Sequence, residues 1–268
     1  MNASLPSAWA VARVAAGREL LSHRLNRFLY AHVLLVGVAG LLPLFTPGDA
    51  LARGAAWWLL HAVLYAISLS ALLFGLSSAH AEAEEFSWLL GQPAGIGPWL
   101  AGKAGALTLL LAAASALLTI PTALAGGGSR ELALAASGAA GVSVVCGLAG
   151  LALGFWIRDG IRGLIAALAT WLAFLFGADL LLLAIAGASF SQQHPDLWVA
   201  ALMVNPLDAF RITILFSAER AAFSGIDAGR LTQWWVANAG GWLMTVSLVW
   251  AAVATLAAWL GARRRLDA

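Results

Sequence analysis

Six long apolar runs constrain this chain more than any other feature, because each is long enough to cross a bilayer as an α-helix. Such a helix needs roughly 20 mostly apolar residues. Since 62% of the residues are hydrophobic and 10% are charged, a soluble domain is excluded. The runs lack the alternating pattern of barrel strands. We therefore predict an all-α polytopic membrane protein with one membrane domain (1–268), whose spans cover 28–46, 54–77, 103–125, 132–157, 161–187 and 234–261.

Residues 1–27 are predicted to form an interfacial helix before the first span. They carry arginines along a helix-like stretch and no small-residue cleavage site after a short apolar core, so they do not resemble a cleaved signal. At 100° per residue, apolar and polar side chains separate onto two faces, as expected of a helix in the headgroup plane. The apolar face holds Val11, Val14, Leu21, Leu25 and Phe28, and the polar face holds Arg13, Glu19, His23, Arg24 and Arg27.

The distribution of positive charge predicts the orientation of the chain. With the N-terminus inside, ten of the fifteen Lys and Arg residues lie in the inner segments and five in the longer outer loops. Positive residues near the ends of spans are retained in the cytoplasm. Six spans then place both termini in the cytoplasm.

The segment 80–102 is a charged, Pro- and Gly-containing interruption between two apolar runs. In the predicted orientation it is cytoplasmic, and it combines three carboxylates with an amphipathic patch. Such a segment is suited to docking a partner protein. The residues concerned are Glu82, Glu84 and Glu85, followed by Phe86, Trp88, Leu89 and Leu90.

Residues 97–104 match the GxxxxGK pattern of a phosphate-binding loop, but we reject that interpretation. The motif requires Ser or Thr after the Lys and a preceding buried strand. Here Ala104 follows, a Pro/Gly-rich stretch precedes, and a span begins. Lys103 is instead predicted to extend to the inner interface. The chain has no recognisable nucleotide site or catalytic motif, so we predict that it is not an enzyme.

Asp179 lies within the fifth apolar run, where a carboxylate costs about 2.5–3.5 kcal/mol on insertion scales. Two interpretations stay open: a hydrogen bond to a neighbouring helix near the outer interface, and a role in a conduit or conformational switch. In the outer segment 188–233, Asn205, Pro206 and Asp208 form the pattern of a helix start. Asp208 and Arg211 are spaced to pair on one face of that helix.

Metal ligands are scarce and scattered. The one cysteine, Cys146, lies inside the fourth span and favours a packing role, as do Gly150 and Gly154 at the spacing that permits close helix contact. His32 and His61 are single residues on apolar runs, more typical of hydrogen-bonded histidines than of ligands. Copper transfer through the chain is therefore poorly supported, and we predict no metal site.

The order of these features resembles the ABC-2 type transporter permeases. In that family, an acidic cluster after the second span is followed by an amphipathic turn, a Pro and a Gly-Lys pair, as at Pro93 and Gly102-Lys103 here. Ala16-Gly17-Arg18-Glu19-Leu20 resembles the family's elbow helix. Phe86-Ser87 stands where the family favours Gly-Thr, and no Arg follows Pro93. Asp179 and Asn205-Pro206-Leu207-Asp208-Ala209-Phe210-Arg211 further resemble the NosY permeases, which serve nitrous oxide reductase maturation.

This resemblance implies a type V exporter-like fold in the bacterial inner membrane, with no nucleic acid partner. It implies two permease copies paired with two NosF-like ATPase subunits that hold ATP and Mg, and a periplasmic NosD-like partner that handles copper. The ATPase-coupling residues would be Glu82, Glu84, Glu85, Phe86, Trp88, Leu89, Arg158 and Arg162. The elbow would carry Arg18 and Glu19, and the periplasmic partner would meet Asn205, Pro206, Asp208 and Arg211.

Two other functions stay open at this point. A generic ABC-2 exporter of lipid, drug or peptide would share every cytoplasmic feature. A stand-alone polytopic membrane enzyme or channel is the third possibility, and the spans offer no convergent set of titratable residues for it.

Overall fold

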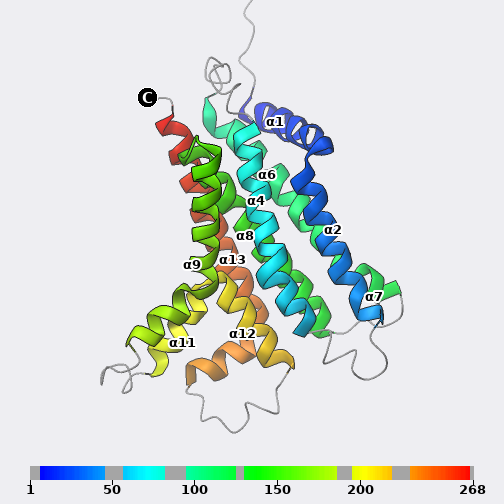
Figure 1. Ribbon diagram of the computed structural model, residues 1–268, viewed down its shortest axis with the longest axis vertical. Helices are drawn as coiled ribbons and strands as arrows, with labels where there is room; N and C mark the ends of the chain where they lie inside the picture. Colours follow the sequence, from blue (N-terminus) through cyan, green and yellow to red (C-terminus); the bar gives the residue numbers. More distant parts are fainter. Residues whose placement is uncertain are drawn as a thin grey trace, which may run out of the picture.

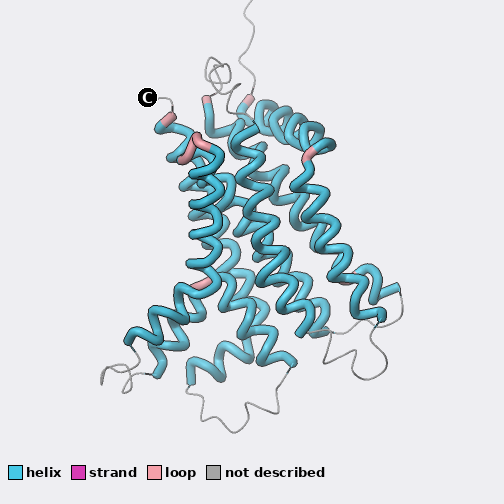
Figure 2. The backbone as a smooth tube through the Cα atoms, in the orientation of Figure 1, coloured by secondary structure: helices cyan, strands magenta, loops and turns pink. Residues whose placement is uncertain are grey.

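The computed structural model describes residues 7–45, 57–81, 95–124, 130–185, 195–218 and 230–265. Within these residues the regular structure is helical and contains no strand (Figure 2). Figure 1 shows long helices standing side by side, with α1 (Ala8–Ser22) lying across one end of the bundle. In the part of the chain that the structure describes, five helices are long and apolar enough to cross a membrane. The prediction of an α-helical polytopic membrane protein is confirmed.

The five candidate spans fall within or overlap the last five predicted apolar runs. The first predicted run, 28–46, contains the shorter apolar helix α2 (Arg27–Leu41), which continues into the 3₁₀ turn η2 (Leu42–Phe45). A sixth crossing by this segment stays a prediction. The spans are Trp57–Ala81, Ile96–Leu118, Leu132–Trp156, Gly160–Ala184 and Ala237–Arg264.

The start of the third span differs from the prediction, and this changes where Lys103 lies. The third span was predicted to begin at Lys103, but α6 (Ile96–Ser115) begins seven residues earlier. Pro98 occupies the first turn, where the missing amide hydrogen would have no partner inside the helix, so it does not delay the start. Gly95 precedes the helix at a φ of 72°, which favours glycine. Lys103 therefore lies about 10 Å along the helix rather than at its start.

The other elements complete the bundle. The second span contains a π-helical turn, η3, which precedes α4, and α13 is kinked at Asn238. The bounds are η1 (His23–Leu25), η3 (Ala62–Ile67), α4 (Ser68–Ala81), η4 (Ala116–Leu118), α7 (Ile120–Leu124), α8 (Arg130–Trp156), α9 (Gly160–Ile185), α11 (Pro195–Val204), α12 (Pro206–Ala218) and α13 (Arg230–Arg264).

α8 is the central helix and packs against α4, α6, α12 and α13. Its contact with α4 depends on glycine. A Cβ atom on Gly75 would lie 1.8 Å from the carbonyl oxygen of Gly147, and one on Gly150 would lie 1.9 Å from that of Leu72. A Cβ on Gly154 would lie 2.5 Å from the Ala79 Cβ. The predicted close packing at Gly150 and Gly154 is therefore confirmed, and Cys146 is buried in the same core.

The periphery of the bundle is apolar. α9 is the least buried of the five spans, and large side chains such as Ile165 and Leu180 are more than half exposed along it. Leu248 and Leu256 of α13 are similarly exposed. In a bilayer such faces contact lipid or another membrane helix.

Several elements that are distant in sequence meet at one end of the bundle. Figure 1 places α1, the last turn of α4, the first turn of α6, the α8–α9 junction and the end of α13 at this end. α11, α12 and the last turns of α9 lie toward the opposite end. We refer to these as the α1 end and the α12 end.

Candidate functional site

α1 differs from its predicted pattern of exposure at two residues. Glu19 and His23 were expected on the water-facing side with Arg13 and Arg24, but both are buried, with 2% and 3% of their surface exposed. The prediction was wrong for these two because it assigned every polar residue to water. Both face the interior instead. Glu19 accepts hydrogen bonds from Ser78 of α4 and Lys103 of α6, and His23 hydrogen-bonds to Glu19 and packs against the Phe74 ring of α4.

Glu19 is the centre of a buried polar network that joins three helices. Its Oε2 accepts a hydrogen bond from Lys103 Nζ of α6 at 2.7 Å, and Lys103 is 1% exposed. Its Oε1 accepts from Ser78 Oγ of α4 and from His23 Nε2 at 2.7 Å. His23 Nδ1 in turn lies 3.3 Å from Asn26 Nδ2, which donates to it and leaves the ring proton on Nε2. We call these four side chains, Glu19, His23, Ser78 and Lys103, the elbow network.

The network holds Glu19 in its ionised form. Burial alone would raise the pKa of Glu19, but the hydrogen bond from His23 and the positive charge of Lys103 outweigh that effect and lower the pKa to about 2. The carboxylate is therefore charged at neutral pH and accepts from every partner. A charged pair excluded from water is stabilising only while both members are present, because removing one leaves an uncompensated buried charge.

One prediction for this region is corrected. Lys103 does not extend to the interface, because the earlier start of α6 places it inside the bundle beside Glu19. Glu19, predicted as an elbow residue, is hydrogen-bonded to side chains of α4 and α6. Arg18, the other predicted elbow residue, is partly buried on the same helix.

The predicted coupling segment is only partly covered by the structure. Its six coupling residues, Glu82, Glu84, Glu85, Phe86, Trp88 and Leu89, lie outside the described residues. The helices on either side of it, α4 and α6, end and begin at the α1 end (Figure 1). His80, the first residue of this segment, lies with Nε2 2.9 Å from the carbonyl oxygen of Ile157. This contact joins the end of α4 to the α8–α9 junction.

Arg158 and Arg162 lie at that junction, and both are exposed. Asp159 Oδ1 accepts from the backbone amide of Arg162 at 2.7 Å, which caps the start of α9. The junction is therefore ordered by its own cap and leaves two guanidinium groups exposed at the α1 end.

A second polar cluster lies toward the α12 end and joins α9 to α12. Asp179 of α9 accepts two hydrogen bonds from Arg211 of α12, each at 2.9 Å. Arg211 Nη2 also lies 2.8 Å from Asp208 Oδ1. The predicted pair of Asp208 with Arg211 is confirmed, and so is the interpretation of Asp179 as bonded to a neighbouring helix. We call Asp179, Asn205, Asp208 and Arg211 the outer cluster.

Asn205 and Pro206 start α12 as predicted. Asn205 Oδ1 accepts from the Leu207 amide at 3.1 Å, and Asn205 Nδ2 donates to Asp208 Oδ2 and to the Phe174 carbonyl oxygen, each at 2.7 Å. Asp208 is 1% exposed. Burial raises its pKa to about 6 despite the opposing effect of the Arg211 charge.

Both clusters contain pairs that the sequence analysis did not join. Glu19 and Lys103 are separated by 84 residues, and Asp179 and Arg211 by 32. One signal was present in each case, namely a charged residue within or beside an apolar run, since such a charge requires a partner. The sequence does not say which residue that partner is.

Within the described residues, no group of three or more His, Cys, Asp or Glu side chains is placed to hold a metal ion. His32 lies with Nδ1 2.8 Å from Ser70 Oγ, and His61 with Nδ1 2.7 Å from the Trp57 carbonyl oxygen. Both histidines are thus hydrogen-bonded within or between helices, as the sequence analysis preferred.

Comparison with known proteins gives no family assignment. No family model matches the chain, and no curated protein matches its sequence.

Proposed function

We propose that this chain is the membrane permease subunit of an ABC transporter. It would couple ATP hydrolysis by a separate, NosF-like ATPase subunit to a conformational change across the inner membrane. The motifs that resemble ABC-2 permeases support this proposal, and two copies of the chain would pair with two ATPase subunits. ATP and Mg would be held by the partner, not by this chain.

The observation that carries the proposal is the convergence of α1, α4 and α6 on the elbow network. α4 ends at Ala81 and α6 begins at Ile96, so both helices overlap the predicted docking segment 80–102, and each contributes a side chain that donates to Glu19. A force applied to that segment would therefore reach α4, α6 and α1 together. Buried charge pairs resist separation, because either ion alone would be desolvated without compensation.

The outer cluster would connect a conformational change at the α1 end to the α12 end. His80 joins α4 to the α8–α9 junction, and Asp179 joins α9 to α12 through two parallel hydrogen bonds to Arg211. α9 can thus transmit a tilt from the α1 end to α12 as a rigid body. In this proposal, Arg158 and Arg162 form a second contact with the ATPase.

The NosY resemblance narrows the proposal to nitrous oxide reductase maturation. A periplasmic NosD-like protein would bind near the outer cluster and handle copper, while the permease transmits motion mechanically. Copper accumulation in vesicles that contain only the permease and its ATPase would contradict this mechanism. ATPase stimulation by a lipid, drug or peptide would favour a generic ABC-2 exporter instead.

The proposal is tested by co-expressing the chain with an ABC ATPase encoded beside it. The complex is purified in detergent, and ATP turnover is compared between the wild type and a Glu82→Ala/Glu84→Ala/Glu85→Ala variant. We expect a stable complex whose association and turnover fall at least tenfold in the variant, because each lost carboxylate removes a charge from the docking segment.

A control variant removes two carboxylates from the other predicted face, through Glu131→Ala and Glu219→Ala. This variant is expected to keep wild-type association and turnover. No association with any ATPase would contradict the transporter proposal, and equal losses in both variants would contradict the assignment of the docking segment.

A further inference from the structure

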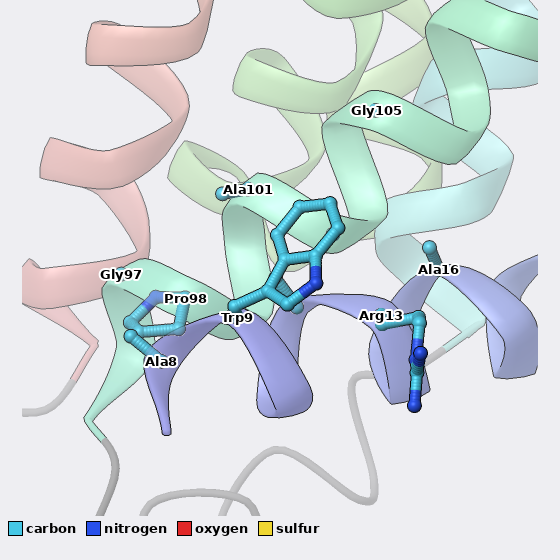
Figure 3. Close-up of a pocket in the computed structure, with 10 residues that line it drawn as sticks. Ala8, Trp9, Arg13, Ala16, Gly97, Pro98, Ala101 and Gly105 are labelled. Carbon is cyan, nitrogen blue, oxygen red and sulfur yellow. The ribbon is translucent and has the colours of Figure 1, made fainter.

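A groove of about 580 Å³ lies between α1 and the first turns of α6 (Figure 3). Among the described residues that line it, Arg13 alone is charged, and the others are Ala, Gly, Pro and Trp. The groove is at the α1 end, where α1 lies across the bundle as an interfacial helix would (Figure 1). Nothing in the elbow network fills it, since Glu19 and Lys103 point into the bundle and are buried.

Small residues create the groove. At its base, α1 and α6 touch through their backbones, because a Cβ on Gly102 would lie 2.1 Å from the Ala12 carbonyl oxygen. On either side of this contact, a Cβ on Gly97 or Gly105 would meet no atom within 4 Å. The two helices therefore touch at Gly102, and beside this contact the small residues leave an apolar trough along the surface of α6.

The two large side chains of the groove point in opposite directions. Figure 3 shows the Trp9 indole on the side of α1 that faces α6 and the Arg13 guanidinium on the other side of α1. Trp9 is 74% exposed, and Arg13 is exposed. An exposed Trp is typical of the membrane interface, where its ring contacts acyl chains and its N–H contacts headgroups.

We infer that this groove binds an anionic phospholipid of the surrounding bilayer. One acyl chain lies in the trough along Ala101 and Gly105, with the Trp9 indole against it, and the phosphate-bearing headgroup lies at the level of Arg13. The charge of Arg13 complements a headgroup that carries net negative charge. An apolar trough fits an acyl chain, which needs no hydrogen-bonding partners. This inference does not depend on the proposed transporter function.

The test uses two pairs of matched variants of the full-length chain. Gly105→Leu fills the trough with a side chain that meets no protein atom at its Cβ, and Gly17→Leu adds the same side chain to α1 at another open position outside the groove. Arg13→Gln removes the groove's charge, and Arg24→Gln removes an exposed charge beyond the end of α1. Each protein is delipidated in detergent and titrated with phosphatidylglycerol or phosphatidylcholine, and bound lipid is counted by native mass spectrometry.

We expect the tightest phosphatidylglycerol site to weaken at least tenfold in Gly105→Leu and about fivefold in Arg13→Gln. The second factor corresponds to about 1 kcal/mol per basic residue near a membrane surface. Gly17→Leu and Arg24→Gln should keep wild-type affinity, and phosphatidylcholine should bind the wild type less tightly than phosphatidylglycerol.

Equal lipid binding by Gly105→Leu and Gly17→Leu would overturn the inference. So would equal affinity of the wild type for the two lipids, or a loss of dimer rather than of lipid in Gly105→Leu, since the groove would then bind a second copy of the chain. If Gly105→Leu fails to fold, the comparison of Arg13→Gln with Arg24→Gln decides alone, because both side chains are exposed.

Discussion

Two charged side chains excluded from solvent, Glu19 and Lys103, stabilise the junction of α1 with α6 only as a pair. Each is at most 2% exposed, and the nitrogen–oxygen distance is 2.7 Å. Ser78 and His23 donate to the other carboxylate oxygen, so Glu19 has hydrogen-bond donors on both of its oxygens. Such a site tolerates replacement of the whole pair better than loss of one member.

We therefore expect Glu19→Gln and Lys103→Met each to reduce the free energy of unfolding by about 3 kcal/mol. The double variant should recover at least half of the larger single loss, because it removes both charges and leaves neither one buried alone. Thermal unfolding in detergent measures all three, with Arg24→Gln as an exposed control that should leave the midpoint unchanged. Additive losses in the double variant would show that the two charges are not coupled.

The outer cluster predicts that replacing Asp179 and replacing Arg211 lower the free energy of unfolding by unequal amounts. Asp179 is 42% exposed at its side chain, and its replacement leaves Arg211 paired with Asp208. Asp179→Asn should thus lower the free energy of unfolding by about 1 kcal/mol or less. Arg211→Gln leaves the buried Asp208 carboxylate without its positive partner and should lower the free energy of unfolding by about 3 kcal/mol. Detergent unfolding of both variants measures the difference, and a larger loss for Asp179→Asn would contradict the geometry of this cluster.

Among the elements, α4 and α8 have the closest contact that the described residues contain, because glycines remove the side chains between them. A Cβ on Gly150 would lie 1.9 Å from the Leu72 carbonyl oxygen, a distance that backbone atoms cannot relieve without moving a helix. By contrast, a Cβ on Gly37 of α2 would meet no atom within 4 Å. The same substitution at the two positions should therefore have opposite signs.

Gly150→Ala is expected to destabilise the protein by about 2 kcal/mol or more, since overpacking moves the helices apart. Gly37→Ala should be neutral or stabilising by up to about 1 kcal/mol, because alanine has the higher helix propensity. Both are measured by unfolding in detergent. A stable Gly150→Ala variant would show that α4 and α8 do not approach each other as closely as described.

At the scale of the whole molecule, the arrangement of the helices predicts which exposed positions share a membrane face. Arg24 and Arg263 are exposed at the α1 end, while Leu124, at the end of α7, is 83% exposed and lies at the opposite end (Figure 1). Cys146 is buried, so it gives little background in cysteine labelling.

In whole cells, a membrane-impermeant maleimide should label Leu124→Cys. Arg24→Cys and Arg263→Cys should be labelled only after permeabilisation, because excess positive charge keeps the α1 end in the cytoplasm. The reverse pattern would invert the predicted orientation. Labelling of Arg24→Cys and Arg263→Cys from opposite sides would exclude an even number of crossings.

The sequence by itself determined the class of fold and the approximate position of five spans, because partition into a bilayer depends on local apolar length, which any window of the chain reports. It also determined the cap at Asn205 and the pairing of Asp208 with Arg211, since both act within one turn of helix. Local patterns of this kind need no knowledge of the neighbouring helices.

Only the tertiary structure decided which distant residues became partners. The polarity of Glu19 and His23 predicts exposure to water, yet packing placed Ser78 and Lys103 opposite them, and the burial of all four follows from those contacts. The same holds for Asp179, whose partner lies on another helix. A charge within or beside an apolar run shows that a partner must exist, but the helix packing that brings the partner close is a property of the whole chain.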